Sequence, residues 1–141
     1  MSSMQQLQSV QKRKLQKAIA HLEYSYNKVK KLSSDAASLD DESLETWESF
    51  AARFSRVADM FLSRYLRSIV LMNDPGFSGS LRDFVNQAEK LGIINNANVW
   101  MAIRELRNIS AHDYSEQDLS EFFKRLLLEC PKLLAIGEIL E

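Results

Sequence analysis

The sequence predicts an all-α protein, folded as an up-and-down bundle of four main helices plus a short helix. Apolar residues recur at steps of three and four over long stretches, which is the period of one buried helix face. Only four glycines and two prolines interrupt the 141 residues, too few for a fold built from many hairpins. A chain of this length suits one hydrophobic core, so residues 1–141 are expected to form a single domain.

The first helix is expected from Gln5 to Leu32. Its predicted buried face consists of Leu7, Val10, the stem of Lys14, Ala18, Leu22, Tyr26 and Val29. The segment SSDAASLDDES should end this helix, because serine and aspartate side chains compete for backbone hydrogen bonds. Ser43 is the expected N-cap of the next helix, with Glu45 and Glu48 near its positive end.

The second helix is expected from Leu44 to Met72 and carries an aromatic stripe. The stripe consists of Trp47, Phe50, Phe54, Val57, Phe61, Tyr65 and Ile69. A stripe of this kind is typical of a protein core or a dimer interface rather than of a ligand site. The turn-forming segment NDPGFSGS should end the helix.

Three further helices follow. Ser80 is expected to cap a short helix from Leu81 to Leu91, with Gly92 as its C-terminal stop. Asn96 or Asn98 should cap a fourth helix that reaches about Ala111. The last helix is expected from Ser115 to Leu127. Pro131 should kink or interrupt this helical segment. The segment KLLAIGEILE should then add a further turn or two.

Composition excludes several classes of protein. The net charge is −1, so there is no global basic field to hold nucleic acid. Cys130 is the one cysteine, so an intrachain disulfide is impossible. No apolar run approaches the roughly 18 residues of a membrane span, and the start of the chain lacks the apolar segment of a signal peptide. A cytoplasmic location with no membrane partner is therefore expected.

Charge is unevenly distributed along the chain. Residues 1–31 carry seven lysines or arginines and one glutamate, residues 35–48 carry six carboxylates, and residues 53–67 carry four arginines and one aspartate. One interpretation is that these are solvated helix faces. The other is that they include a local basic surface within a neutral protein, which RNA binding could use.

Conventional catalytic and metal-binding motifs are missing from the sequence. Two histidines and one cysteine cannot make a conventional zinc site, and phosphate-binding, dinucleotide-binding and nucleophile-elbow motifs are absent. We therefore expect no metal and no cofactor. His21 is interpreted as a structural surface or half-buried residue, and Cys130 as a small packing residue.

The segment RELRNISAHDY, residues 104–114, contains the side chains best suited to acid–base chemistry and phosphate binding. Arginine binds phosphate as a planar permanent cation, and histidine can take or give a proton near pH 7. Arg107 and His112 could thus promote attack of a ribose 2′-hydroxyl on the neighbouring phosphate. On one continuous helix the two side chains would diverge by about 140°. Either the helix ends near Ala111, or a second copy across a two-fold axis supplies the missing group.

A purely structural interpretation of this segment also exists. Arginine and protonated histidine are favourable at a helix C-terminus because they face the negative end of the helix dipole. Under that interpretation, Tyr114 is a packing residue at a helix junction.

The pattern R-N-x-x-x-H-x-Y resembles the signature of HEPN-domain ribonuclease toxins, most closely the HepT type found beside MntA-like minimal nucleotidyltransferases. The resemblance implies a small helical bundle that acts as a metal-independent endoribonuclease. It also implies a homodimer in which both subunits line one composite cleft. Carried onto this chain, Arg107 and His112 are the catalytic pair and Asn108 the polar residue beside them, while Arg104 is expected to bind the RNA substrate.

The resemblance further implies that Tyr114 is adenylylated by a cognate nucleotidyltransferase, which silences the toxin. An AMP group would add charge and bulk beside the cleft and so exclude RNA. Two alternatives stay open: a non-catalytic subunit that docks a nucleotidyltransferase, and a plain helical adaptor in which the motif is accidental.

Overall fold

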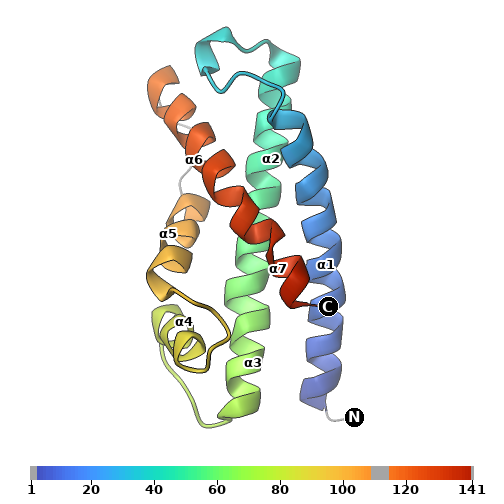
Figure 1. The fold of residues 1–141 in the computed structure, drawn as a ribbon, viewed down its shortest axis with the longest axis vertical. Coiled ribbons are helices and arrows are strands. Elements are labelled where there is room, and N and C mark those ends of the chain that lie inside the picture. The colour runs from blue at the N-terminus through green and yellow to red at the C-terminus, as the bar shows by residue number, and fades with distance from the viewer. Residues whose placement is uncertain (1–2, 109–114, 141) are drawn as a thin grey trace.

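The computed structural model describes residues 3–108 and 115–140, and it has the all-α bundle that the sequence predicts. The helices are α1 (Ser3–Val29), α2 (Asp41–Asp59), α3 (Leu66–Asn73), α4 (Leu81–Lys90), α5 (Ala97–Asn108), α6 (Glu116–Leu134) and α7 (Ile136–Ile139), with a 3-10 turn η1 (Ala36–Ser38) and a π-helical segment η2 (Met60–Tyr65). Helix α1 runs antiparallel to the continuous helix α2–η2–α3, α4 and α5 lie on the other side of that helix, and α6 crosses the bundle (Figure 1). The described residues contain no strand.

The N-terminal half of α1 turns a different face inward from the one predicted. Leu7 and Val10 are 48% and 38% exposed, and Lys14 is also exposed. Two glutamines face the neighbouring helix instead: Gln8 hydrogen bonds with Tyr65, and the Gln11 Oε1 atom accepts a hydrogen bond of 2.8 Å from the Ser68 hydroxyl. The prediction for this part of the buried face was therefore wrong, because a polar seam rather than an apolar one joins the two helices here.

The turn between α1 and α2 is fixed by side-chain hydrogen bonds. The predicted cap Ser43 is wrong: the N-cap is Asp40, whose Oδ1 atom accepts from the Ser43 backbone N–H at 2.8 Å. Helix α2 consequently begins at Asp41, earlier than expected. The Trp47 indole N–H donates to the Ser33 carbonyl at 2.9 Å, which ties the turn to the core.

The long second helix contains one π turn that changes which residues face inward. The Leu66 N–H donates to the Phe61 carbonyl, five residues back, so this turn holds one residue more than an α-helical turn. After Phe61 the most deeply buried positions are Leu62, Leu66 and Val70. Tyr65 of the predicted stripe is buried as expected, whereas Ile69 is only half-buried. An α-helical period continued through this segment would have placed the stripe one residue earlier.

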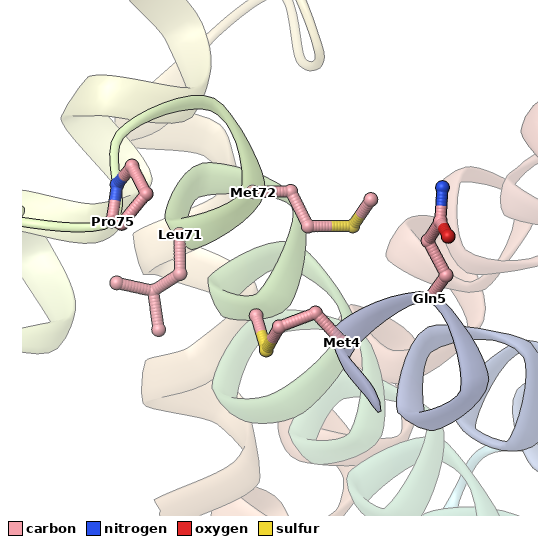
Figure 2. A pocket seen from close by; sticks show the side chains of 5 residues that line it. All are labelled: Met4, Gln5, Leu71, Met72 and Pro75. Carbon is pink, nitrogen blue, oxygen red and sulfur yellow. The ribbon is translucent and has the colours of Figure 1, made fainter. Parts of the chain in front are cut away.

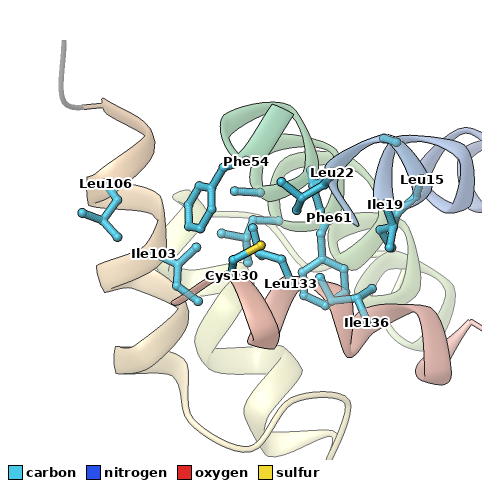
Figure 3. Close-up of a cluster of buried hydrophobic side chains, with 14 of the residues drawn as sticks. Leu15, Ile19, Leu22, Phe54, Phe61, Ile103, Leu106, Cys130, Leu133 and Ile136 are labelled. Carbon is cyan, nitrogen blue, oxygen red and sulfur yellow. The ribbon is translucent and has the colours of Figure 1, made fainter. Parts of the chain in front are cut away.

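The aromatic stripe belongs to the core of the monomer (Figure 3). Trp47, Phe50, Phe54 and Phe61 have no exposed surface. The Trp47 ring stacks on Phe123 of α6, with ring centroids 4.6 Å apart and planes at 12°. Of the two roles expected for the stripe, core and dimer interface, these four rings therefore take the first.

The shorter helices carry the predicted caps. The Ser80 hydroxyl accepts from the Asp83 N–H at 3.2 Å, and an Asp83 carboxylate oxygen accepts from the Ser80 N–H at 2.8 Å, completing a capping box. Gly92 has a φ of +77°, the left-handed conformation typical of a helix C-terminal stop. Of the two predicted caps of α5, Asn96 accepts from the Val99 N–H at 3.2 Å.

Helix α6 continues through its proline. It extends to Leu134 with Pro131 inside it, so the expected interruption near Leu127 did not occur. Proline costs one backbone hydrogen bond and strains the preceding turn. The neighbouring residues Cys130 and Leu133 are fully buried, and this packing holds the last turn of α6 in place. Among the described helices, none is both long and apolar enough to cross a membrane.

Candidate functional site

The predicted motif lies where α5 leads into α6. Arg107 and Asn108 are the last two residues of α5, and only their backbone is described. His112 and Tyr114 lie outside the described residues. The predicted end of the helix near Ala111 also falls outside them.

Helix α6 begins directly after the motif. The Ser115 hydroxyl accepts from the Asp118 N–H at 3.1 Å, which makes Ser115 the N-cap of α6, as predicted. The motif's arginine and asparagine belong to α5, whereas its histidine and tyrosine lie among residues 109–114, outside the described part of the chain.

Arg104 lies one turn before Arg107 on α5 and is half-buried. Its Nε atom is enclosed, and no hydrogen-bond partner for it exists among the described residues. An enclosed donor without a partner costs roughly 1–3 kcal/mol of stability. Such a group calls for an explanation. Because the atom is enclosed by the protein, a ligand could reach it only if the side chains that cover it moved.

A polar cavity of about 520 Å³ lies beside the first turns of α6. It is lined by residues of the turn before α2 and by residues of α6, namely Ser33, Ser34, Asp35, Ala37, Glu116, Gln117, Ser120, Glu121 and Lys124. The Ser120 hydroxyl joins the two walls, since it accepts from the Ala36 N–H at 2.8 Å and donates to the Glu116 carbonyl at 2.8 Å. Three carboxylates against one ammonium make this wall unfavourable for a phosphate.

Residues suited to other chemistry are missing from the described part of the chain. It contains no group of three or more histidine, cysteine or carboxylate side chains that could hold a metal ion. Cys130 is fully buried, and this burial raises the pKa of its thiol to about 12. The thiol is therefore protonated and inert near neutral pH, as expected for a packing residue. His21 is exposed on α1.

A second cavity, of about 490 Å³, lies between the first turn of α1 and the end of α3 (Figure 2). Met4, Leu71, Met72 and Pro75 give it apolar walls, and Gln5 contributes an amide. None of these side chains can act as an acid, base or nucleophile. This cavity is therefore a place for apolar contact rather than for chemistry.

Helix α1 carries an exposed basic surface, in line with the local basic surface that the charges of residues 1–31 and 53–67 suggested as one of two interpretations. Lys14, Lys17, His21, Tyr24 and Lys28 are all exposed, and on an α-helix they fall within an arc of about 80°. Their spacing of three and four is a signal that the sequence does contain. The arginines of α2 that lie against this arc could not be found from the sequence, because their placement depends on how α1 and α2 are aligned.

Comparison with known proteins adds no relative: no family model, no curated protein and no solved structure matches the chain.

Proposed function

We propose that this chain is a metal-independent endoribonuclease of the HEPN type, a HepT-like toxin that a cognate minimal nucleotidyltransferase silences. The observation that carries the proposal is the R-N-x-x-x-H-x-Y motif at the junction of α5 and α6 in an all-α bundle. Arg107 and Asn108 lie in α5 (Ala97–Asn108), and Ser115, the residue that follows the motif, caps α6.

The proposed reaction needs only the side chains of the motif. His112 removes the proton from a ribose 2′-hydroxyl as its oxygen attacks the adjacent phosphorus. The bond from phosphorus to the 5′ oxygen breaks, leaving a 2′,3′-cyclic phosphate and a 5′-hydroxyl that takes up a proton. Arg107 stabilises the charge that develops on the phosphate oxygens. Asn108 orients the imidazole or a phosphate oxygen, and Arg104 helps to bind the substrate.

A homodimer is part of the proposal. Arg107 and His112 would point about 140° apart on a single continuous helix, so a second copy related by a two-fold axis can complete the site. Sedimentation at micromolar concentration should show a dimer. A species that stays monomeric would argue against a composite site.

The cleavage test compares matched variants of the full chain on a mixed-sequence RNA. Arg107→Ala and His112→Ala should each lower the cleavage rate by about 10²–10⁴-fold. Lys90→Ala and Arg125→Ala should cleave as wild type does, because both residues are exposed on other helices, α4 and α6. EDTA should have no effect. If wild type leaves RNA intact, or if the motif variants cut as well as wild type, the nuclease proposal fails.

The silencing step is tested by co-expression with a cognate nucleotidyltransferase. The peptide that contains Tyr114 should gain the mass of one or more AMP units, and RNA cleavage should stop. Tyr114→Phe should retain cleavage and escape silencing, since the hydroxyl takes no part in proton transfer. A modification found on Tyr24, Tyr26 or Tyr65 instead would contradict the assignment.

One observation favours a second candidate function, a non-catalytic subunit that docks a nucleotidyltransferase. The cavity beside the start of α6 is lined by Asp35, Glu116 and Glu121, which suits a basic protein surface better than RNA. Under this alternative, the unmodified chain binds the nucleotidyltransferase but leaves RNA intact. Charge reversal at Glu116 and Glu121 should then weaken that complex.

A further inference from the structure

A continuous basic surface runs along the seam between α1 and α2. We define the α1–α2 basic face by eight residues: Lys14, Lys17, His21, Tyr24, Lys28, Arg53, Arg56 and Arg64. Glu23, the acidic residue of α1, points about 180° away from Lys14 on the helix. The α1 part of the face runs from Lys14 to Lys28, which is about 21 Å of helix.

The arginines of α2 and η2 lie against the basic arc of α1. The Arg53 Nη1 atom donates to the His21 carbonyl at 3.0 Å and to the Ser25 hydroxyl at 2.8 Å. Lower on the seam, Lys14 and Arg64 line the same hollow of about 210 Å³. Arg56 is exposed, one turn after Arg53 on α2. Cations from two antiparallel helices therefore converge on one strip.

An aromatic ring lies in the middle of this strip. Tyr24 is 63% exposed, whereas the other aromatic side chains that the structure describes are buried or half-buried. The Lys28 ammonium lies 5.5 Å and the Arg53 guanidinium 5.9 Å from the centre of its ring. Because Arg53 is held by its two hydrogen bonds to α1, one neighbour of the ring is fixed in position. Each cation also attracts the π-electrons of the ring.

We propose that the α1–α2 basic face binds single-stranded RNA, an inference that rests on the proposed ribonuclease function. One base stacks on the Tyr24 ring, and Lys17, Lys28 and Arg56 contact the phosphates. Exposed aromatic rings within a basic groove are the usual means of holding single strands without sequence preference. Helix α2 also contacts α5. One helix, about 10–12 Å in diameter, thus separates the bound strand from the helix that ends in the motif.

The composition of the face favours RNA over a protein partner. Protein interfaces are depleted of lysine at their centre and enriched in apolar residues. Tyr24 is the one large apolar side chain exposed in the upper half of α1, since Leu7 and Val10 lie near its start. The acidic wall beside the start of α6 repels phosphate. A substrate for the motif must then be held mainly by a different surface, and this face provides one.

Binding is tested with the full chain carrying His112→Ala, so that a labelled 20-nucleotide single-stranded RNA stays intact during fluorescence anisotropy. Tyr24→Ala in this background should weaken binding by about 5- to 100-fold, the usual effect of losing one stacked base. The triple variant Lys17→Gln, Lys28→Gln and Arg56→Gln should flatten the plot of log affinity against log salt. The slope should change by about 0.7 for each lost phosphate contact.

The matched control is Lys90→Gln, Lys124→Gln and Arg125→Gln, which removes the same charge from exposed positions of α4 and α6. It should keep the affinity and the salt slope of the parent. If this control loses as much RNA affinity and salt slope as the first triple variant, the face is not the RNA site. The same conclusion follows if Tyr24→Ala binds RNA as tightly as the parent. Binding to vesicles of anionic phospholipid but not to RNA would also overturn the inference. Circular dichroism confirms that each variant is folded.

The outcomes for this face and for the proposed function can be told apart. If wild type cleaves RNA and the first triple variant cleaves equally fast at low RNA concentration, the proposal that the face binds RNA is refuted, and the proposal of nuclease activity is supported. If the face binds RNA as expected but wild type never cleaves RNA, the proposal of nuclease activity is refuted, and the proposal that the face binds RNA is supported.

Discussion

The contact between Trp47 and Phe123 joins α2 to α6 and should be one of the strongest in the core. Both rings are buried, their centroids are 4.6 Å apart, and Trp47 also meets Phe50 edge-on at 5.8 Å. Truncating a buried aromatic residue to alanine costs about 3–5 kcal/mol, a large part of the roughly 5–15 kcal/mol that holds a domain folded. Leucine is the better replacement, because it keeps part of the volume and should leave the protein folded.

We expect Trp47→Leu and Phe123→Leu each to lower the free energy of unfolding by about 1.5–3 kcal/mol, less than truncation to alanine would. The double variant should lose less than the sum by about 0.5–1.5 kcal/mol, the usual coupling of a stacked pair. Trp47→Phe keeps a ring but removes the N–H that donates to the Ser33 carbonyl. It should therefore lose about 0.5–1.5 kcal/mol through that hydrogen bond.

The assay is urea denaturation followed by circular dichroism at 222 nm, since the variants remove a tryptophan and so alter fluorescence. Tyr24→Leu is the control, because Tyr24 is 63% exposed and surface changes usually stay within about 0.5 kcal/mol. Additive losses in the double variant would show that the two rings do not interact. A loss below about 0.5 kcal/mol for Trp47→Leu would show that α2 and α6 do not pack as described.

Three further predictions concern individual positions. Gly79 has a φ of +146°, and a Cβ there would lie 2.5 Å from an Asp83 carboxylate oxygen. In urea denaturation, Gly79→Ala should therefore lower the free energy of unfolding by about 1–3 kcal/mol. A Cβ at Gly137 has no atom within 4 Å, so Gly137→Ala should be neutral or stabilising. Burial raises the pKa of Cys130 to about 12, so a thiol reagent at pH 8 should label it only after unfolding; rapid labelling of the folded chain would contradict this. Hydrogen bonds from Ser43 lower the pKa of Asp40 below 3.8, so its stabilising effect is present above that value and is lost as pH falls through the folded pKa. Between pH 5 and 3 the urea midpoint of Asp40→Asn should fall less than that of wild type, and parallel curves would refute this.

Local signals in the sequence were enough to place most of the helices. Apolar spacing identified them. The caps at Ser80, Asn96 and Ser115 were found because each depends on a side chain that accepts from a backbone N–H three residues later. The prediction that Ser43 is the N-cap was wrong because Asp40, three residues earlier, caps the helix and so begins it sooner. The predicted interruption of the last helix at Pro131 was wrong because the packing of its buried neighbours in α6 outweighs the local cost of proline.

The candidate site divides in the same way. The motif and its residues Arg104, Arg107, Asn108, His112 and Tyr114 are a pattern of residue types at fixed spacing, which a sequence displays directly. Their roles stay predictions until the cleavage and modification tests are made. Whether an exposed arc of α1 meets arginines of α2 is a separate question, because those arginines are about thirty residues away along the chain.

The sequence by itself determined that this protein is a bundle of helices, where most of them begin, and that the R-N-x-x-x-H-x-Y motif begins within the fourth main helix. These features depend on contacts within a few residues, which the 3.6-residue period and side-chain caps encode locally. Only the tertiary structure decided that Gln8 and Gln11, not Leu7 and Val10, face the second helix, and that a π turn moves its buried stripe. It also decided that Arg53 lies against His21 and Ser25. Several neighbouring stripes of one helix satisfy the same period, and the stripe that becomes buried depends on the shape and polarity of the helix packed against it.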